Sequence, residues 1–193
     1  MIRRRSPAKE TTEKPFLPSP GMVRFLSLAE HIHDAVEERR GDDYVDDISD
    51  LYPTAYVLLE EMAAHFEGWY IGRGKDRSVY AVGGYVVKVA RHVIGRDANL
   101  AESNRWARAP RSHLPWLLPT IASDQDGRWL VMQSADGYTV SKSWLMKFSR
   151  WYSNGKPDIT SMPPRSLIDS VEHGDNDTDW AVLAGHPVLY DYA

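Results

Sequence analysis

Gly72, Gly74 and Lys88 stand at a spacing that could bind phosphate groups. The two glycines form a Gly-x-Gly turn between two segments rich in β-forming residues, and Lys88 lies on the next such segment. Glycines let backbone N–H groups approach phosphate oxygens because no Cβ is in the way. The turn is neither a Walker A loop, which needs Gly-Lys-Ser/Thr, nor a dinucleotide-binding turn, which a helix would follow. By itself, a Gly-x-Gly turn is more often only a turn.

A carboxylate on the following helix could hold this lysine in place. Lys88 lies between Val87 and Val89 on an expected strand, so its side chain points to the opposite face from both. Glu102 lies on the helix expected over 96–109, where its carboxylate could pair with the Lys88 ammonium. Taken singly, each is better explained as an exposed charged side chain. Their combination with the glycine turn is what indicates a phosphate site.

Short strands separated by turns must position these residues. Gly83 and Gly84 between two apolar runs predict a tight hairpin. One helix, ended by Pro110, separates the third strand from the fourth. The β-rich segments predict strands over 69–71, 78–82, 85–90, 117–122 and 128–133.

Helices are expected on both sides of this sheet region. Apolar residues at a spacing of three and four predict two N-terminal helices that pack as a pair or a brace, and the C-terminal part reads as two helices and two short strands. The run 41–50 is acidic without an ordered ligand register, so a solvated loop is favoured over a metal site. The helices are expected over 22–40, 53–66, 140–151 and 164–171, and the last strands over 180–184 and 187–190.

Composition excludes several classes of protein. The chain has 193 residues, enough for one domain to bury a core without disulfides or a structural metal. Its net charge is −4, which argues against general nucleic-acid binding, and the absence of cysteine excludes a disulfide scaffold and thiol catalysis. No apolar stretch reaches the roughly 18 residues of a membrane span, and no secretory signal opens the chain. We expect a soluble, cytoplasmic protein.

The order of the chemical groups resembles the small lobe of the protein-kinase-like superfamily. That family has a glycine-rich loop, a lysine on the third strand, a glutamate on the following helix and two further strands. Gly72, Gly74, Lys88 and Glu102 match this order within residues 68–134. The resemblance implies an ATP site in which Lys88 holds the α- and β-phosphates and Glu102 orients Lys88.

Three further positions follow from this resemblance. Val79, shortly after the glycines, would belong to the nucleotide site, and Met132 would begin the hinge 132–134 that meets the adenine. Arg77 stands where the family has a third glycine. The loop therefore allows a less close approach of its backbone to phosphate groups than one with three glycines, but the arginine could still face phosphates.

The end of the chain resembles the family's metal site. The stretch 188–191 looks like the strand that leads to the metal-binding aspartate, with 192–193 in the place of the usual Phe-Gly. The resemblance thus assigns Asp191 to Mg²⁺.

Two alignments of the preceding loop stay open. In one, His173-x-x-Asn176 matches the family pattern and Asn176 is the second Mg²⁺ ligand. In the other, His173-Gly-Asp175 resembles aminoglycoside- and choline-kinase-like enzymes, and Asp175 is the catalytic base. Neither alignment supplies both residues. The first is favoured for Asn176 because its distance to Asp191 leaves a normal hairpin, and Asp175 remains the candidate base.

The expected fold is α+β: a reduced protein-kinase-like fold with a five-stranded antiparallel small lobe and one inserted helix. Because the chain stops two residues after Asp191, we expect no activation segment and no peptide-docking region. The expected parts are a disordered basic tail over 1–20, a helical N-terminal extension over 21–67, the small lobe over 68–134 and a truncated, mostly helical large lobe over 135–193.

The function that this resemblance implies is ATP and Mg²⁺ binding, with phosphotransfer through an atypical catalytic loop. The alternatives are an inactive pseudokinase, or a phage-encoded virion or host-modulating protein that keeps only the scaffold, since tailed phages encode similar reduced chains. Such a protein would belong in the host cytoplasm or the virion. The expected partner is a nucleotide. A protein partner could bind the N-terminal tail or the lobe surfaces, whereas neither membrane nor nucleic acid is expected.

Overall fold

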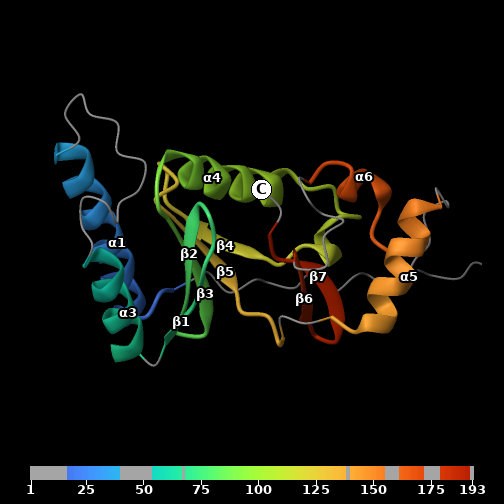
Figure 1. The fold of residues 1–193 in the computed structure, drawn as a ribbon, viewed down its shortest axis with the longest axis horizontal. Helices are drawn as coiled ribbons and strands as arrows, with labels where there is room; N and C mark the ends of the chain where they lie inside the picture. The colour runs from blue at the N-terminus through green and yellow to red at the C-terminus, as the bar shows by residue number, and fades with distance from the viewer. Residues whose placement is uncertain are drawn as a thin grey trace, which may run out of the picture.

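The computed structural model describes residues 17–39, 54–66, 68–137, 140–154, 161–171 and 179–191. Its centre is a five-stranded antiparallel sheet with the strand order β1-β2-β3-β5-β4 (Figure 1). The strands are β1 (Trp69–Arg73), β2 (Arg77–Val82), β3 (Tyr85–Ala90), β4 (Thr120–Ser123) and β5 (Trp129–Gln133). All five expected strands are present. The fourth begins later than the expected residue 117, because Leu117 and Leu118 contact another segment, described below.

One helix, α4 (Val93–Arg108), is inserted between β3 and β4, and a short 3-10 helix (Leu114–Trp116) follows it. The helix begins before the expected residue 96 and ends, as expected, just before Pro110. The α+β class, the five-stranded antiparallel sheet and the single inserted helix are confirmed, and they are compatible with a reduced kinase-like fold.

The glycines of the β2–β3 hairpin adopt the conformation that their pairing predicts. Gly83 and Gly84 have φ values of +58° and +81°. Two successive residues in the left-handed region give a turn whose twist matches that of the flanking strands. This turn sets the register in which Val79 lies opposite Lys88.

Two helices, α1 (Pro20–Arg39) and α3 (Ala55–His65), cover one face of the sheet (Figure 1). Alternate residues of β3 explain this arrangement. Val87 and Val89 are buried in one cluster with Phe25 of α1 and Leu59 of α3, whereas Val86 belongs to a second cluster with the C-terminal part of the chain. The outer face of β3 is therefore apolar and covered by helices, and Lys88 lies on the inner face beside Val86.

The C-terminal part packs around aromatic side chains. It contains α5 (Lys142–Ser153), α6 (Arg165–Ile168) and a hairpin of β6 (Trp180–Leu183) and β7 (His186–Leu189). The rings of Trp144 and Phe148 lie 4.9 and 5.3 Å from the ring of Trp180, centre to centre. The helix expected over 164–171 is shorter than expected, since the chain turns at residue 169 and the Ser170 hydroxyl donates to the Leu167 carbonyl at 2.7 Å.

A short contact joins β7 to the sheet region. Leu117 and Leu189 form a parallel bridge, and the Leu118 amide donates to the Leu189 carbonyl at 2.7 Å. This contact directs the next two residues, Tyr190 and Asp191, towards the face of the sheet that carries Lys88. The N-terminal tail and the acidic run over 41–50, by contrast, are expectations that fall mostly or wholly outside the described residues.

Within the described part of the chain, no helix has both the length and the apolar character that crossing a membrane requires.

A buried histidine joins α1 to the sheet. His33 Nε2 donates to the Ala90 carbonyl at 2.9 Å, and Arg96 of α4 donates to His33 Nδ1 at 3.2 Å. Both contacts require a neutral ring with its proton on Nε2. Burial, with help from the nearby Arg96 charge, lowers the pKa of His33 from its ordinary 6.5 to about 4.

This histidine predicts a pH-dependent stability. The unfolded chain protonates His33 near pH 6.5, whereas the folded chain does so only near pH 4. The free energy of unfolding should therefore be greatest above pH 6.5 and fall between pH 6.5 and 4, by at most about 3 kcal/mol. Urea unfolding at several pH values should show this slope, and His33→Gln should flatten it because glutamine can make both contacts without titrating.

The matched control is His31→Gln, on the exposed side of the same helix. It should leave the slope as in the unaltered chain. Equal slopes in the His33→Gln variant and the unaltered chain would contradict the assignment.

Candidate functional site

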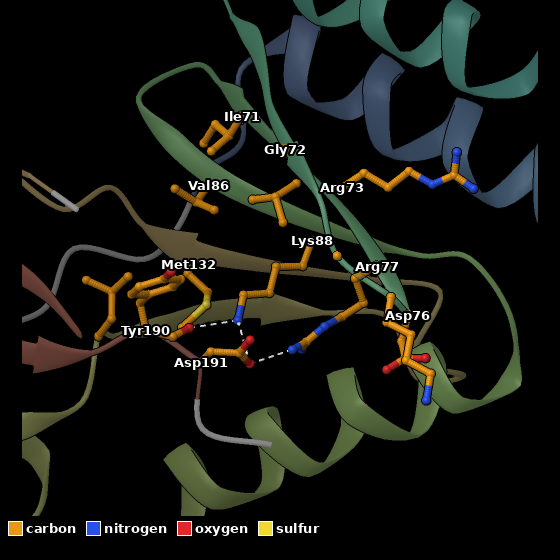
Figure 2. Close-up of a pocket in the computed structure, with 14 residues that line it drawn as sticks. Ile71, Gly72, Arg73, Asp76, Arg77, Val86, Lys88, Met132, Tyr190 and Asp191 are labelled. Atoms are coloured by element: carbon orange, nitrogen blue, oxygen red, sulfur yellow. Dashed lines mark hydrogen bonds and ion pairs between the residues drawn. The ribbon is translucent and has the colours of Figure 1, made fainter. Parts of the chain in front are cut away.

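A cavity of about 520 Å³ lies between the β1–β2 turn and the segment that follows β7. Figure 2 shows the side chains of Lys88, Arg77 and Asp191 pointing toward one another within it. Most of the residues singled out from the sequence meet at this place. The cavity is lined by the predicted residues Gly72, Gly74, Val79, Lys88, Met132 and Asp191.

The predicted pair of Lys88 and Glu102 is present. Lys88 Nζ donates to both carboxylate oxygens of Glu102, each at 2.9 Å. The two side chains are 3% and 0% exposed. Strand pairing fixes the position of Lys88, which lies between Val79 of β2 and Leu130 of β5. The helix α4 brings Glu102 to it from the other side.

The segment after β7 adds two more groups. Lys88 Nζ donates to the Tyr190 carbonyl at 2.7 Å, and Asp191 Oδ1 lies 3.5 Å from the same nitrogen. An ammonium has three N–H groups, and two of them are directed at Glu102. Asp191, which the sequence resemblance assigned to Mg²⁺, thus lies beside the lysine, and nothing in the sequence indicated the Tyr190 carbonyl as a partner.

Arg77 lies between the two carboxylates. Its Nη1 donates to Glu102 and its Nη2 to Asp191, both at 2.5 Å. In the sequence, Arg77 stands at the position of the missing third glycine, where it could face phosphates. The sequence did not predict these two partners. No local pattern could have shown them, since Asp191 is 114 residues away in the chain.

These four residues form a charge cluster with two cations, Lys88 and Arg77, and two carboxylates, of which Glu102 is fully buried and Asp191 is 44% exposed on the cavity side. Burial raises the pKa of Glu102, against the opposing effect of the two cations. Burial acts in the same direction on Asp191, but Lys88 and Arg77 outweigh it and hold the pKa of Asp191 well below its usual range. Burial lowers the pKa of Arg77, but both carboxylates outweigh it and hold that pKa above its usual value.

The β1–β2 turn is fastened to the start of α4. The Gly74 amide donates to the Arg77 carbonyl at 2.8 Å, and Arg91 donates to the Gly74 carbonyl at 3.0 Å through its side chain and to the Asp76 carbonyl at 2.9 Å through its amide. Gly95 of α4 permits this close approach, because a Cβ there would lie 2.1 Å from the Asp76 carbonyl oxygen. The loop is therefore held in one place above the cavity.

Apolar side chains form the other walls of the cavity. The sequence predicted Val79 and Met132, and both are there. Ile71, Val86 and Leu118 complete these walls and were not predicted. The alternation of β3 could have indicated Val86, since it shares a face with Lys88, whereas the pairing of β1 with β2 is irregular at Ile71. Leu118 lies there only because of the contact with β7.

Asp175 and Asn176, the predicted base and second metal ligand, lie outside the described residues. Among the described residues, no group of three or more His, Cys, Asp or Glu side chains is placed to hold a metal ion. Of the predicted metal ligands, the structure thus places only Asp191, and places it in the charge cluster.

No protein-family model matches the chain, and no curated protein matches it. Among solved structures, it is similar to the ternary complex of streptomycin, ATP and APH(2″)-IIa, an aminoglycoside phosphotransferase, at 19% identity and a TM-score of 0.35. The alignment covers 51% of this chain and 33% of that one. The chain therefore matches about a third of the length of that structure.

The charge cluster predicts a large effect of removing Glu102. In Glu102→Gln, Lys88 and Arg77 both lose a charged partner in a buried place, and removing one partner of a buried ion pair costs about 3 kcal/mol or more. Urea unfolding should show a loss of this order in the free energy of unfolding. Glu61→Gln, at an exposed position of α3, is the control and should change the midpoint little. Equal midpoints in the two variants would rule out a stabilising role for the cluster.

Proposed function

We propose that the chain binds ATP in this cavity and that residues 68–134 act as a reduced kinase-like small lobe. The observation that carries the proposal is the buried Lys88–Glu102 pair at the edge of a cavity that the Gly72–Gly74 turn covers. A lysine held by a carboxylate is a positioned cation. Nucleotide phosphates are the ligand class whose charge and oxygen acceptors match it.

The apolar walls suit the base of a nucleotide. The side chains of Val79, Val86 and Met132 offer aliphatic surface to the faces of a flat ring, and Leu118 lies against them. A cavity of about 520 Å³ is of a size usual for small-molecule sites. The proposed orientation therefore has the adenine against these side chains and the phosphates towards Lys88.

The phosphates would exchange with one present partner of Lys88. Its two contacts with Glu102 involve a charged acceptor, whereas the Tyr190 carbonyl is neutral. Hydrogen bonds between charged groups are stronger than those to neutral acceptors. A phosphate oxygen should therefore replace the carbonyl rather than the carboxylate, so that Glu102 keeps Lys88 in position when the ligand is bound.

Magnesium does not fit Asp191 as the structure places this residue. Its Oδ1 accepts a hydrogen bond from Arg77 and lies 3.5 Å from the Lys88 ammonium. A divalent ion at the same oxygen would meet repulsion from two cations at short range. The other proposed ligand, Asn176, lies outside the described residues. No step of the proposed function is therefore derived through Mg²⁺.

The contact between Arg77 and Asp191 favours a second candidate function, a pseudokinase that binds nucleotide without transferring phosphate. Phosphotransfer needs a base that orients the acceptor hydroxyl, for which Asp175 is the candidate. ADP formation from ATP separates the two functions. Turnover that Asp175→Asn abolishes without weakening ATP binding would support phosphotransfer, and binding without turnover would support the pseudokinase.

Lys88→Met tests the nucleotide site directly. The variant keeps an unbranched side chain one atom shorter and removes its charge, so calorimetric titration should show ATP affinity reduced by about tenfold or more. Lys142→Met, at an exposed position of α5, removes the same charge elsewhere and should bind ATP as the unaltered chain does. Absence of ATP binding by the unaltered chain, or equal affinity in the Lys88→Met variant, would contradict the proposal.

Gly72→Leu tests the position of the cavity rather than its charge. A Cβ at Gly72 meets no atom within 4 Å, so the new side chain should extend into open space and leave the thermal midpoint nearly unchanged. Because Gly72 lines the cavity, the same side chain should occlude it and reduce ATP affinity by about tenfold or more.

Gly137→Leu is the matched control, since a Cβ there also meets no atom within 4 Å. This variant should bind ATP normally. If Gly72→Leu folds and binds ATP as well as the control does, the nucleotide does not lie under the β1–β2 turn.

A further inference from the structure

Arg77 has a position that a solvent-exposed loop arginine would not have. Its side chain is 11% exposed, and it bridges a carboxylate of α4 and a carboxylate that follows β7. Figure 2 shows it directed to the same point as Lys88, with a dashed line to Asp191. It also lines the cavity, so it is close enough to act on a ligand there.

The charges of the cluster balance without a metal ion. Lys88, Glu102 and Asp191 alone carry one positive and two negative charges, a deficit that a bound cation would have to correct. Arg77 corrects it from within the chain, through hydrogen bonds to both carboxylates. In the absence of nucleotide, a divalent ion added to the four residues would leave an excess of two positive charges, and it would be repelled by Lys88 and Arg77 at short range.

The guanidinium also has unused capacity for phosphate oxygens. It has five N–H groups in a planar fork that suits carboxylates and phosphates. The described structure uses one N–H for Glu102 and one for Asp191. Arg77 can therefore keep both carboxylates while it donates to a phosphate on its cavity side.

We propose that Arg77 takes the place of the divalent cation in this site, so that the chain binds nucleotide phosphates without Mg²⁺, through Lys88 and Arg77 together. The inference rests on the proposed function, because it concerns how the same cavity holds ATP. Arg77 supplies the positive charge that a bound metal ion would otherwise supply. It stands at the position where the resemblance expects a glycine.

The test is ATP titration of the full chain in EDTA and in excess Mg²⁺, with Arg77→Gln and the control Arg111→Gln, which is at an exposed position. The unaltered chain and the control should bind ATP with affinities that agree within about threefold in the two buffers. Arg77→Gln should lose about tenfold or more in EDTA and regain part of it in Mg²⁺, because Asp191 is then available to the ion.

Three outcomes would overturn the inference. ATP binding by the unaltered chain only in Mg²⁺ would overturn this inference and leave the proposed function standing. Absence of ATP binding in both buffers would overturn the proposed function and the inference with it. Equal affinity of Arg77→Gln and the unaltered chain in EDTA would also overturn the inference, since Arg77 would then not contact the phosphates.

A measurement without nucleotide checks the same point. Mn²⁺ added to the free chain can be followed through the relaxation of water protons. The unaltered chain should give little enhancement, and Asp191→Asn should not change it. Arg77→Gln should give a larger enhancement, which Arg77→Gln combined with Asp191→Asn removes. Enhancement in the unaltered chain that Asp191→Asn abolishes would show that a cation already binds there, which overturns the inference.

Discussion

The cost of burying charge is the constraint on which this structure depends. Glu102 is fully buried, and an unpaired carboxylate in such a place costs several kcal/mol. The two cations Lys88 and Arg77 balance the charges of the two carboxylates, Glu102 and Asp191. Each of the four charges comes from a different segment: β2, β3, α4 and the residues after β7. These segments must therefore meet at one point. Three structural features bring them there: the register of the sheet, the inserted helix, and the bridge between Leu117 and Leu189.

The sheet can carry a polar site because its other face is closed by helices. In β3, one set of alternate residues packs against α1 and α3, and the other set faces the cavity and the C-terminal part. His33 fastens α1 to the end of β3 and to α4 through Ala90 and Arg96. The N-terminal helices thus supply a hydrophobic core for one face of the sheet, and the inner face is left to the charge cluster and the cavity.

The sequence allowed the local part of this arrangement to be predicted, and the long-range part was beyond it. The alternation of side chains in β3 predicted that Lys88 points to the opposite face of the strand from its flanking valines, and the following helix supplied Glu102. Both residues were predictable because they lie within one short stretch of chain. The partners of Arg77 were not predictable, since they depend on how the end of the chain folds back over the sheet. The helix predicted over 164–171 is present only over Arg165–Ile168, because the chain turns at residue 169 and the Ser170 hydroxyl donates to the Leu167 carbonyl. Asp175 and Asn176 remain predictions.

The two sides of the cavity differ in how they are attached. The β1–β2 turn is hydrogen-bonded to Arg91 and packs closely against Gly95, so several contacts attach it to the start of α4. The residues after β7 are held to the cavity by Lys88 and Arg77, and the contact of Lys88 with the Tyr190 carbonyl is the one that a bound phosphate would replace. One wall of the cavity is therefore held by contacts within the chain alone, whereas a ligand would replace one of the contacts that hold the other wall. If the chain binds ATP as proposed, discrimination between ligands by shape would belong to the wall under the β1–β2 turn, and adjustment to ligands of different length would belong to the wall after β7.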